Sequence, residues 1–417
     1  MREMKDSGIE WIGEIANTHK LVRLKYVAEI LDEYRKPVTA QYRNQNADIL
    51  YDYYGASGII DKIDRYTIDD HVMLIGEDGA NLKLRNLPLM YEVCGKAWIN
   101  NHAHILKPMK NMDFYYLFYA LEALDINNYI TGSAQPKLNQ ENLKEILIPL
   151  PSYEVQKKVS SYLDTKCSEI DATAEDIQKE ISLLEEYKKS VITEAVTKGL
   201  NPDAEMKESG IEWIGKIPIN WQAVNPRWLF AQRKDKAKKG MEQYTASQKY
   251  GVISQKDYMN RIGGSIVTVQ KDFDILKMVC KGDFVIHMRS FQGGLEYSEH
   301  TGSISSAYVM LIPQKNIGEC RYFKWLFKSA SYINALQSTS NLIRDGQAMR
   351  YSNFIQIIIP YPPLEEQQQI ADFLDSKCSE IDSLIADKKR QLDILADYKK
   401  SLIYEYVTGK KEVPVNE

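Results

Sequence analysis

Residues 163–171 have the sequence LDTKCSEID, and residues 374–382 have the sequence LDSKCSEID. A second pair of stretches repeats in the same way, because MKDSGIEWIG at residues 4–13 returns as MKESGIEWIG at residues 206–215. The two members of each pair differ at a single position. Near-identical segments that recur at a similar separation indicate a chain made of two copies of one frame.

Two long inserts between the repeats share no obvious sequence. Residues 20–151 contain 15 basic and 17 acidic side chains, whereas residues 223–362 contain 19 basic and 10 acidic ones. The whole chain has a net charge of −4, so positive charge is concentrated in the second insert, as expected of a surface that faces phosphates. The first insert must gather its positive charge locally or bind DNA with help. This organisation predicts one scaffold that presents two different recognition surfaces.

Residues 152–199 and 363–410, which follow the inserts, are predicted to form two long helices. Apolar side chains recur every seven residues in both segments, which is the heptad pattern of a coiled coil. About 45 residues give a helix of ~68 Å, and two such helices most simply pack as an antiparallel coiled-coil pair. The alternative is that each apolar stripe faces the core of its own domain. The stripes are Leu163, Ile170, Ala174, Ile177, Ile181, Leu184 and Val191, and Leu374, Ile381, Ile385, Leu392, Leu395 and Leu402, with Lys388 as an interruption.

Each insert is predicted to be a small α+β domain with a twisted, mostly antiparallel sheet. Short β-rich runs alternate with turn signals, and Asp113 is suited to cap a helix. The expected strands are residues 49–53, 72–75, 103–106 and 146–149, then 283–288, 307–312 and 355–360; the expected helices are residues 113–124 and 322–336.

The predicted domain division has five parts. Residues 1–151 form the N-terminal frame with the first recognition domain, and residues 152–199 form the first spacer helix. Residues 200–362 contain a linker, the repeated frame and the second recognition domain. Residues 363–410 form the second spacer helix, and residues 411–417 form a tail.

The sequence lacks the motifs of nucleotide-dependent catalysis. It contains no GxxxxGK[ST] loop, no GxGxxG-type turn after a strand, and no Asn-Pro-Pro-aromatic segment of amino-methylating enzymes. We therefore expect no catalytic residues, and no cofactor or metal held by this chain.

Three further features favour ordinary structural explanations. His102 and His104 are spaced to share one face of a strand, which could suit a metal, but no third ligand is evident. Residues 202–207, PDAEMK, contain the elements of a nuclease site, yet the Asp and Glu are two residues apart in a polar linker. The five cysteines form no CxxC pair, and no apolar run is long enough to cross a membrane, so we expect a cytoplasmic protein.

Long polar side chains near glycine are the candidates for DNA contact. Arg and Gln can make bidentate contacts with guanine and adenine, and Lys contacts phosphates. The alternative for each residue is an ordinary solvated side chain. The candidates are Arg289, Ser290, Gln292, Arg344, Gln347, Arg350 and the basic run Arg233, Lys234, Lys236, Lys238 and Lys239 in the second insert, and Ser57, Gln135 and Lys137 in the first.

The order of these parts resembles the specificity (S, HsdS) subunit of type I restriction–modification systems. The resemblance rests on the double SGIEWIG frame, on GSAQPKLNQENLKEILIPLP at residues 132–151, and on PPLEEQQQIADFLDSKCSEID at residues 362–382. It covers essentially the whole chain. One departure is PLPSYEVQ at residues 149–156, which replaces the fuller PPLEEQ form.

The resemblance implies a fold and a role. The fold is α+β, with two small target-recognition domains separated by two long antiparallel coiled-coil helices in a pseudo-two-fold, circular arrangement. The role is non-catalytic recognition of double-stranded DNA, with two methyltransferase (M) subunits docked on the helical frame and restriction/motor (R) subunits joining them. S-adenosylmethionine, ATP and magnesium then belong to these partners.

Two different domains on one spacer should bind a split, asymmetric DNA site. Modules on one face of B-DNA lie about 10 bp apart, so two half-sites of ~4 bp leave ~6 bp whose sequence is not recognised. The alternatives are a freestanding DNA-cleaving or DNA-modifying enzyme with fused recognition domains, and a coiled-coil scaffold that binds only protein. The missing catalytic motifs count against the first, and the positive second insert counts against the other.

Overall fold

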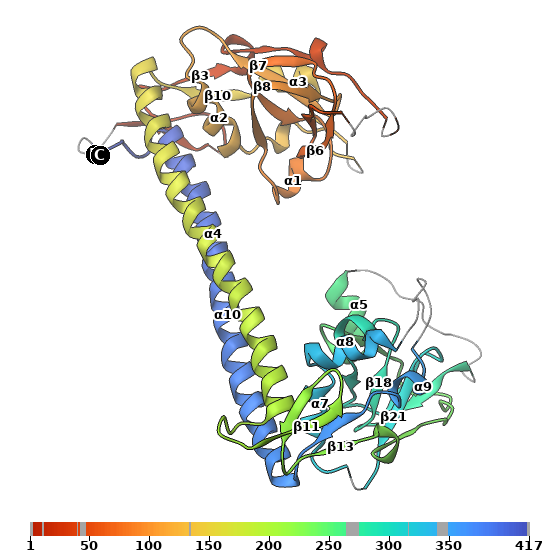
Figure 1. Cartoon of the computed structure of the whole chain (residues 1–417). Helices are drawn as coiled ribbons and strands as arrows, with labels where there is room; N and C mark the ends of the chain where they lie inside the picture. The colour runs from red at the N-terminus through yellow and green to blue at the C-terminus, as the bar shows by residue number, and fades with distance from the viewer. Residues whose placement is uncertain are drawn as a thin grey trace. The chain divides into compact units, whose positions relative to one another are not determined.

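The computed structural model describes residues 3–10, 12–39, 41, 47–132, 135–263, 275–315, 317–339 and 349–414 (Figure 1). Contacts divide the chain into two compact units. Unit 1 contains Met1–Ile177 and Arg390–Glu417, and unit 2 contains Gln178–Lys389. The divisions fall inside two long helices, α4 (Tyr153–Lys198) and α10 (Leu364–Val407). Each unit therefore contains one insert and a segment of both helices.

Unit 1 is built around a six-stranded sheet of order β4-β9-β7-β8-β5-β6. All neighbouring strands in it are antiparallel except the pair β5 and β8. Two small ladders join β1 to β2 and β3 to β10. The strands are β1 Met4–Asp6, β2 Glu14–Ala16, β3 Lys20–Arg23, β4 Ala28–Ile30, β5 Tyr51–Gly55, β6 Gly58–Ile63, β7 Ile68–Gly76, β8 Met90–Ile99, β9 Ala103–Pro108 and β10 Leu147–Leu150.

Strand β7 lies in the middle of this sheet because both of its faces are apolar. Val72 and Leu74 pack in one hydrophobic cluster, whereas Met73 and Ile75 pack in another. All four side chains are fully buried. The alternation of side chains along a strand therefore gives each face of the sheet its own core.

Helix α2 packs on the sheet, and an N-terminal cap begins it. The side chain of Asp113 caps it by accepting a hydrogen bond from the amide of Tyr116 at 2.9 Å. The predicted helix at residues 113–124 is thus confirmed. The helices of this part are α1 Asn81–Leu84, α2 Phe114–Ala123 and α3 Gln140–Glu145, with 3₁₀ turns η1 Leu24–Tyr26, η2 Asp32–Tyr34 and η4 Asn127–Tyr129.

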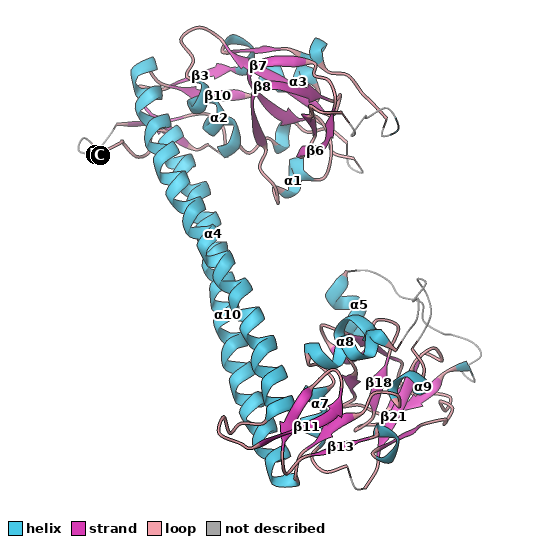
Figure 2. Cartoon of the chain, viewed as in Figure 1, coloured by secondary structure: helices cyan, strands magenta, loops and turns pink. Residues whose placement is uncertain are grey.

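Unit 2 also combines strands and helices (Figure 2), around a four-stranded antiparallel sheet of order β14-β21-β18-β19. Four two-stranded ladders complete it. Its strands are β11 Met206–Ile211, β12 Gly215–Pro218, β13 Gln222–Val224, β14 Phe230–Gln232, β15 Tyr244–Ser247, β16 Gly251–Ser254, β17 Lys277–Val279, β18 Phe284–Ile286, β19 Glu296–Tyr297, β20 Gly302–Ile304, β21 Val309–Pro313 and β22 Ile359–Tyr361; its helices are α5 Gln255–Ile262, α6 Ser290–Gly293, α7 Cys320–Leu326, α8 Ala330–Ser338 and α9 Tyr351–Phe354, with the 3₁₀ turn η5 Pro226–Trp228.

The core of unit 2 is aromatic. The ring of Phe230 lies 5.4–5.5 Å, between centroids, from the rings of Phe284, Phe323, Phe327 and Phe354. Three of these four pairs are edge-on, the geometry that aromatic quadrupoles favour. The second insert thus buries its sheet with phenylalanines, whereas the first uses mainly aliphatic side chains.

The structure corrects two predicted elements of the second insert. The single helix predicted at residues 322–336 is two helices, α7 and α8. They are separated because the Ser329 hydroxyl donates to the carbonyl of Leu326 at 2.7 Å and accepts from the amide of Tyr332 at 3.4 Å. The strand predicted at residues 355–360 is also mostly wrong, since β22 begins only at Ile359.

The two long helices are confirmed and run antiparallel. In unit 1, Lys399 of α10 lies 2.7 Å from Asp171 of α4. In unit 2, Lys188 of α4 lies 2.6 Å from Asp382 of α10. These pairs join repeat-equivalent residues of the two sequence copies. The interrupting Lys388 is also accommodated by an ion pair, at 2.5 Å from Glu180.

Each domain core is completed by the end of the helix that belongs to the other copy. In unit 1, Tyr406 and Val407 of α10 pack in the same cluster as Tyr116. In unit 2, Ala195 and Val196 of α4 pack in the same cluster as Tyr322. Because the last helix of the chain closes the first domain, the connectivity is circular.

Equivalent tyrosines fix these helix ends. The hydroxyl of Tyr116 lies 2.7 Å from the carbonyl oxygen of Pro149 and 3.1 Å from that of Val407. In unit 2, the hydroxyl of Tyr322 lies 3.0 Å and 3.4 Å from the carbonyl oxygens of Val196 and Pro360. The two units therefore repeat one plan.

Equivalent glutamines begin the long helices. The amide of Gln156 donates to the carbonyl of Pro151 at 3.1 Å, and its oxygen accepts from the amide of Asp113. Gln367 donates to the carbonyl of Pro362 at 2.8 Å and accepts from the amide of Glu319. The segment at residues 149–156 differs from the PPLEEQ form but keeps Gln156, the side chain that makes these contacts. Separately, none of the helices in the described ranges is both long and apolar enough to span a membrane.

Candidate nucleic-acid interface

In unit 1 the candidates Gln135 and Lys137 lie on a closed loop. The backbones of Thr131 and Lys137 exchange two hydrogen bonds of 2.8 Å. Gly132 has a φ of 81°, and a Cβ there would collide with the carbonyl oxygen of Gln135. The side chains of Gln135 and Lys137 are exposed. The turn therefore requires glycine, and it presents both candidates to solvent.

Lys137 is not a free cation on this loop. Its ammonium lies 3.0 Å from Glu77 Oε1, although about half of its side chain, 53%, remains exposed. This ion pair raises the pKa of Lys137. Lys137 is therefore both held by unit 1 and open to a phosphate.

The remaining candidate of unit 1, Ser57, is exposed in the turn between β5 and β6. This turn lies close to the end of β7, because a Cβ at Gly76 would come within 2.6 Å of the carbonyl oxygen of Ala56. The next residue, Glu77, contacts Lys137. The structure thus brings the Ser57 turn and the loop of Gln135 and Lys137 to the same end of β7.

In unit 2, Arg289 and Gln292 are exposed, whereas Ser290 is fully buried. The Ser290 hydroxyl accepts a hydrogen bond from the amide of His287 at 2.9 Å. The carbonyl of Arg289 accepts one from the side chain of Gln248 at 2.9 Å. Arg289 and Gln292 are therefore available to a ligand, and Ser290 shapes the turn that carries them.

A buried polar group supports this turn from below. His287, 4% exposed, lies 3.6 Å from Glu296. Glu296 in turn pairs with the ammonium of Lys328, which also donates to the carbonyl of Gly293 at 3.0 Å. The following Gly294 has a φ of 75°, and a Cβ there would overlap the carbonyl oxygen of Phe327. Hydrogen bonds and close backbone packing thus fix the turn.

Lys234, Lys236, Lys238 and Lys239 are all exposed. They follow β14, and Lys236 forms an isolated bridge with Lys277 at the start of β17. Burial, together with the charge of Lys236, lowers the pKa of Lys277. Positive charge is therefore concentrated where the segment after β14 meets the start of β17, and such a surface suits contact with the phosphate backbone of DNA.

Arg233, predicted to belong to the same basic run, has a different role. Its guanidinium contacts both oxygens of Asp283, at 2.7 Å and 2.9 Å, and it lies 2.9 Å from Asp235. Its side chain is 14% exposed and that of Asp283 only 2%. These hydrogen bonds raise the pKa of Arg233. The phosphate contact stays a prediction that this geometry does not favour, because the guanidinium already neutralises a buried carboxylate.

Of the last group of candidates, Arg344 and Gln347 lie outside the described residues. Arg350 is exposed directly before α9. Its backbone amide donates to the side chain of Asn353 at 3.1 Å, which starts the helix. The side chain of Arg350 is thus presented at a helix start.

His102 and His104 do not share a face of a strand. His102 lies in the turn before β9 and faces Asp78 at 2.7 Å, with 48% of its side chain exposed. His104 lies within β9, is 1% exposed and faces Asp32. Among the residues that the structure describes, no group of three metal-ligating side chains is arranged to hold a metal ion.

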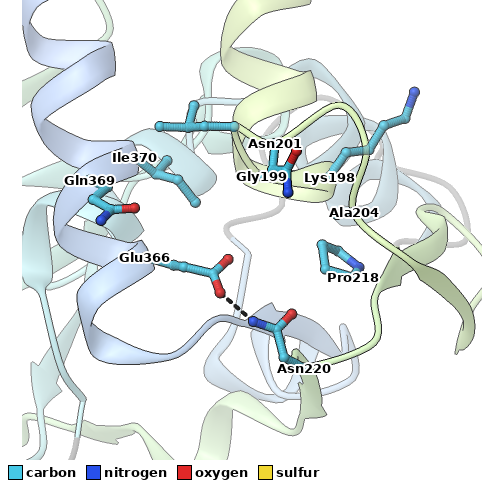
Figure 3. Close-up of a pocket in the computed structure, with 10 residues that line it drawn as sticks. Lys198, Gly199, Asn201, Ala204, Pro218, Asn220, Glu366, Gln369 and Ile370 are labelled. Atoms are coloured by element: carbon cyan, nitrogen blue, oxygen red, sulfur yellow. Dashed lines mark hydrogen bonds between the residues drawn. The ribbon is translucent and has the colours of Figure 1, made fainter.

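The linker that resembled a nuclease motif borders a cavity of about 380 Å³ in unit 2 (Figure 3). Asp203 and Glu205 are exposed, and β11 begins directly after them. Glu366 is the only acidic residue in the cavity lining, and it accepts hydrogen bonds from Asn220 and from Trp221 Nε1. The carboxylate thus ties the start of α10 to the repeated frame, and the described lining has no second carboxylate with which to share a cation.

Comparisons with known proteins agree with this organisation. A family model described as the type I restriction modification DNA specificity domain matches residues 17–183 and again residues 218–393. The chain therefore belongs to the family of type I restriction–modification specificity subunits, the non-catalytic DNA-recognition components of such systems.

Individual relatives extend over different shares of the chain. It is 26% identical over 408 residues to the putative MjaX specificity subunit of Methanocaldococcus jannaschii, covering 94% of this chain and 84% of that one. It is also 26% identical over 340 residues to the MjaVIII specificity subunit of the same organism, covering 76% of each. A shorter match, 33% identical over 141 residues, covers only 35% of the putative specificity subunit S.HindORF215P of Haemophilus influenzae.

A solved structure supports the fold. One of its chains, described under "Structural basis underlying complex assembly and conformational transition of the type I R-M system", matches with a TM-score of 0.66 at 14% identity. The match covers 95% of this chain and 99% of that one. The two recognition domains and the paired long helices are thus a known architecture.

Sequence reasoning missed the side chains that hold the candidate loops. Asp32, Arg35, Glu77 and His104 meet beneath the loop of Gln135 and Lys137, although Asp32 and His104 are 72 positions apart. The one signal in the sequence for this cluster is His104 itself, a polar residue inside the apolar run of β9.

Proposed function

We propose that this specificity subunit binds a bipartite, asymmetric DNA site, with one half-site recognised by the domain of unit 1 and the other by the domain of unit 2. The observation that supports this most strongly is the contrast between frame and inserts. Tyr116 and Tyr322 make equivalent contacts, as do Gln156 and Gln367. The loops carried by the inserts have nothing in common, so two unlike half-sites are expected.

The same frame would give identical partners two equivalent docking sites. The pair Lys166 and Glu169, at 3.3 Å, recurs as Lys377 and Glu380, at 2.9 Å. Both glutamates are 60% exposed and both lysines about one-third exposed, so all four side chains reach solvent where a partner can contact them. Retention of the same exposed residues in both copies suits a partner that binds twice, such as the methyltransferase (M) subunit.

In this proposal the chain binds no cofactor of its own. S-adenosylmethionine is held by the M subunits, and ATP and Mg²⁺ by the restriction/motor (R) subunits that join them on the DNA in the cytoplasm. The specificity subunit then determines where methyl transfer occurs, through the positions of its two recognition domains.

Sequencing of methylated DNA tests this function. The full chain, co-expressed with its methyltransferase partner, should methylate one motif with two fixed half-sites and an unrecognised spacer of ~6 bp. Exchange of residues 223–362 for the corresponding insert of another specificity subunit should change one half-site only. A continuous motif, or a change in both half-sites after the exchange, would contradict the proposal. The purified chain with S-adenosylmethionine alone should transfer no methyl group.

A further inference from the structure

His104 lies directly beneath the 135–139 segment and touches it. Its Nε2 donates a hydrogen bond to the carbonyl oxygen of Leu138 at 2.8 Å, and its Nδ1 lies 2.7 Å from Asp32 Oδ2. Both partners are acceptors, so both hydrogen bonds form together only when both ring nitrogens carry a proton. The ring is 1% exposed. A buried imidazole ring with a carboxylate on one side thus holds the backbone on the other.

Glu77 holds the same segment from a second side. Its carbonyl oxygen accepts from the amide of Leu138 at 2.7 Å, and its carboxylate pairs with Lys137 at 3.0 Å. The amide and the carbonyl of Leu138 are therefore both bound, to Glu77 and His104 respectively. Leu138 itself is fully buried, which leaves this part of the loop little freedom to shift.

Arg35 links the two carboxylates beneath the segment. Its guanidinium lies 3.1 Å from Asp32 and 2.5 Å from Glu77. Burial acts to raise the pKa of both carboxyls. For Asp32, hydrogen bonds together with the charges of His104 and Arg35 outweigh burial, and the pKa is below its usual value. For Glu77, the hydrogen bonds from Lys137 and Arg35 do the same. Both carboxylates are therefore ionised, and the cluster holds its charges in one fixed arrangement.

Such a cluster is an inefficient way to stabilise a fold. The cost of desolvating buried charges offsets much of their attraction, and apolar side chains of similar volume often stabilise a protein as well. A buried ionic cluster does, however, fix direction, because each hydrogen bond works only in a narrow range of angles. Because this cluster lies under an exposed loop, it is better suited to orienting that loop than to stabilising the fold.

We propose that His104 is a positioning residue for DNA recognition. Through the carbonyl of Leu138 it sets the placement of Gln135 and Lys137, so base selection by unit 1 depends on a buried side chain that never touches DNA. This proposal rests on the proposed function, since it assigns the loop to one half-site.

The test compares His104→Gln with the matched control His71→Gln in the full chain assembled with its methyltransferase partner. His71 also pairs with a carboxylate at 2.7 Å, that of Glu92, on the same sheet, but it does not contact the 135–139 segment. Glutamine at position 104 can donate to only one of the two acceptors in the same geometry. Binding is measured on the cognate duplex and on duplexes with single base changes in each half-site, well below the melting temperature.

We expect His104→Gln to reduce discrimination at one or two positions of the unit 1 half-site by about tenfold, within the range expected when a single base interaction is removed. Discrimination at the other half-site should stay at the wild-type level, as should both half-sites in His71→Gln. A simple loss of stability would instead weaken binding to all duplexes alike. Unchanged discrimination at the unit 1 half-site, or equal losses at both half-sites, would overturn the proposal.

If His104→Gln does not assemble, Asp32→Asn decides the question, because it removes the carboxylate that faces His104 Nδ1 and keeps the ion pair of Lys137 with Glu77. The same loss at the same half-site is expected, and its absence would again overturn the proposal. A wild-type complex that recognises no bipartite site would refute the proposed function itself. A wild-type bipartite site that His104→Gln and Asp32→Asn recognise normally would refute this inference alone.

Discussion

The two units share a frame and differ in how they hold their recognition loops. In unit 1 an ionic cluster holds the loop, because His104 and Glu77 bind the carbonyl and the amide of Leu138 and Asp32 pairs with the other ring nitrogen of His104. In unit 2 the ion pair of Glu296 and Lys328 also holds the turn of Arg289, but there close packing is added, because Gly294 leaves no room for a side chain against Phe327. Each loop is nevertheless fixed to the sheet beneath it.

This difference shows which parts of the molecule are constrained. Tyr116 and Tyr322, which are equivalent residues of the two inserts, contact the helix of the other copy, so a change at either position disturbs the junction between insert and frame. The contacts that hold each loop join residues of a single insert. An insert can therefore change its recognition surface together with its support, while the frame stays the same.

The largest expected effect comes from removing one copy. A fragment of residues 1–205 lacks the α10 residues that complete the core of unit 1. A second copy of the fragment can supply the end of α4 instead, with Ala195 in the place of Tyr406. We expect a homodimer that carries the first insert twice and directs methylation to a palindrome of the first half-site.

Light scattering and methylome sequencing with the methyltransferase partner measure this outcome. Val196 is fully buried against the unit 2 core in the whole chain, so Val196→Asp in the fragment is a control that should remain monomeric. A monomeric parent fragment, or a methylated site without palindromic symmetry, would contradict the shared plan of the two units.

The second prediction concerns the long helices as a ruler for the DNA spacer. Seven residues inserted into α4 alone should disturb its register against α10 and abolish activity. Matched insertions in both helices should lengthen the spacer by about 3 bp, since seven helical residues add ~10 Å and each base pair occupies ~3.4 Å. Methylome sequencing of the doubly extended chain is the measurement. Altered half-sites with an unchanged spacer would show that the helices do not set the spacing.

Much of the fold could be predicted because its signals are local. The heptads of the long helices and the β-rich run at residues 72–75 need only neighbouring residues, and both predicted elements are confirmed. The break at Ser329 was missed, because a serine within an apolar helical pattern is ambiguous until its hydroxyl is seen to cap the next helix. The five-part domain division stays a prediction, since the contact-based division falls inside the helices.

The interface was less predictable, because charge partners are distant in sequence. Arg233 and Lys234 are neighbouring cations that sequence alone does not distinguish, yet it is Arg233 that pairs with Asp283, 50 positions away. Ser290 is polar and next to glycine-rich sequence, but it is buried and supports the turn. Composition therefore selects candidate segments for DNA contact, whereas the ion pairs and hydrogen bonds of the structure decide which of their side chains are already engaged within the protein.

The third prediction separates these two classes in unit 2. Arg233→Ala should cost about 3–5 kcal/mol of folding free energy, because it leaves the buried carboxylate of Asp283 without its partner. Chemical denaturation of the full chain, followed by an unfolding probe placed in unit 2, measures the loss. A variant as stable as the wild type would show that Asp283 finds another partner.

Replacement of Lys234, Lys236, Lys238 and Lys239 by Gln is the matched comparison. Stability should change little, because surface substitutions usually stay within ~0.5 kcal/mol each. The dependence of log affinity on log salt should flatten by ~0.9 for each phosphate that is no longer neutralised, with the preferred site unchanged. An unaltered salt slope would leave the lysines without a role in binding.

The fourth prediction concerns the exposed arginines of unit 2. If Arg289 or Arg350 contacts a base, its replacement by Ala should cost about 1–3 kcal/mol of binding free energy and relax one position of one half-site. Competition binding with singly substituted duplexes measures this, and Gln135→Ala tests the same expectation for the other half-site. Equal losses on specific and random DNA would instead identify a phosphate contact.

The smallest expected effect is the response of unit 1 to acid. The pKa values of Asp32 and Glu77 lie below their usual values of 3.8 and 4.5, because hydrogen bonds from cationic partners outweigh burial. Their contribution to stability is therefore complete above about pH 4.5 and is lost as the pH falls through the lowered values. The groups facing them are His104, Arg35 and Lys137, so protonation of the carboxyls removes the negative partners of the Arg35 guanidinium and the Lys137 ammonium. Hydrogen-exchange protection of the Leu138 amide, corrected for intrinsic rates, should fall from pH 5 to pH 3 in the wild type. In Glu77→Gln protection should start lower and change less, and an equal acid response in both proteins would show that this cluster does not govern the loop.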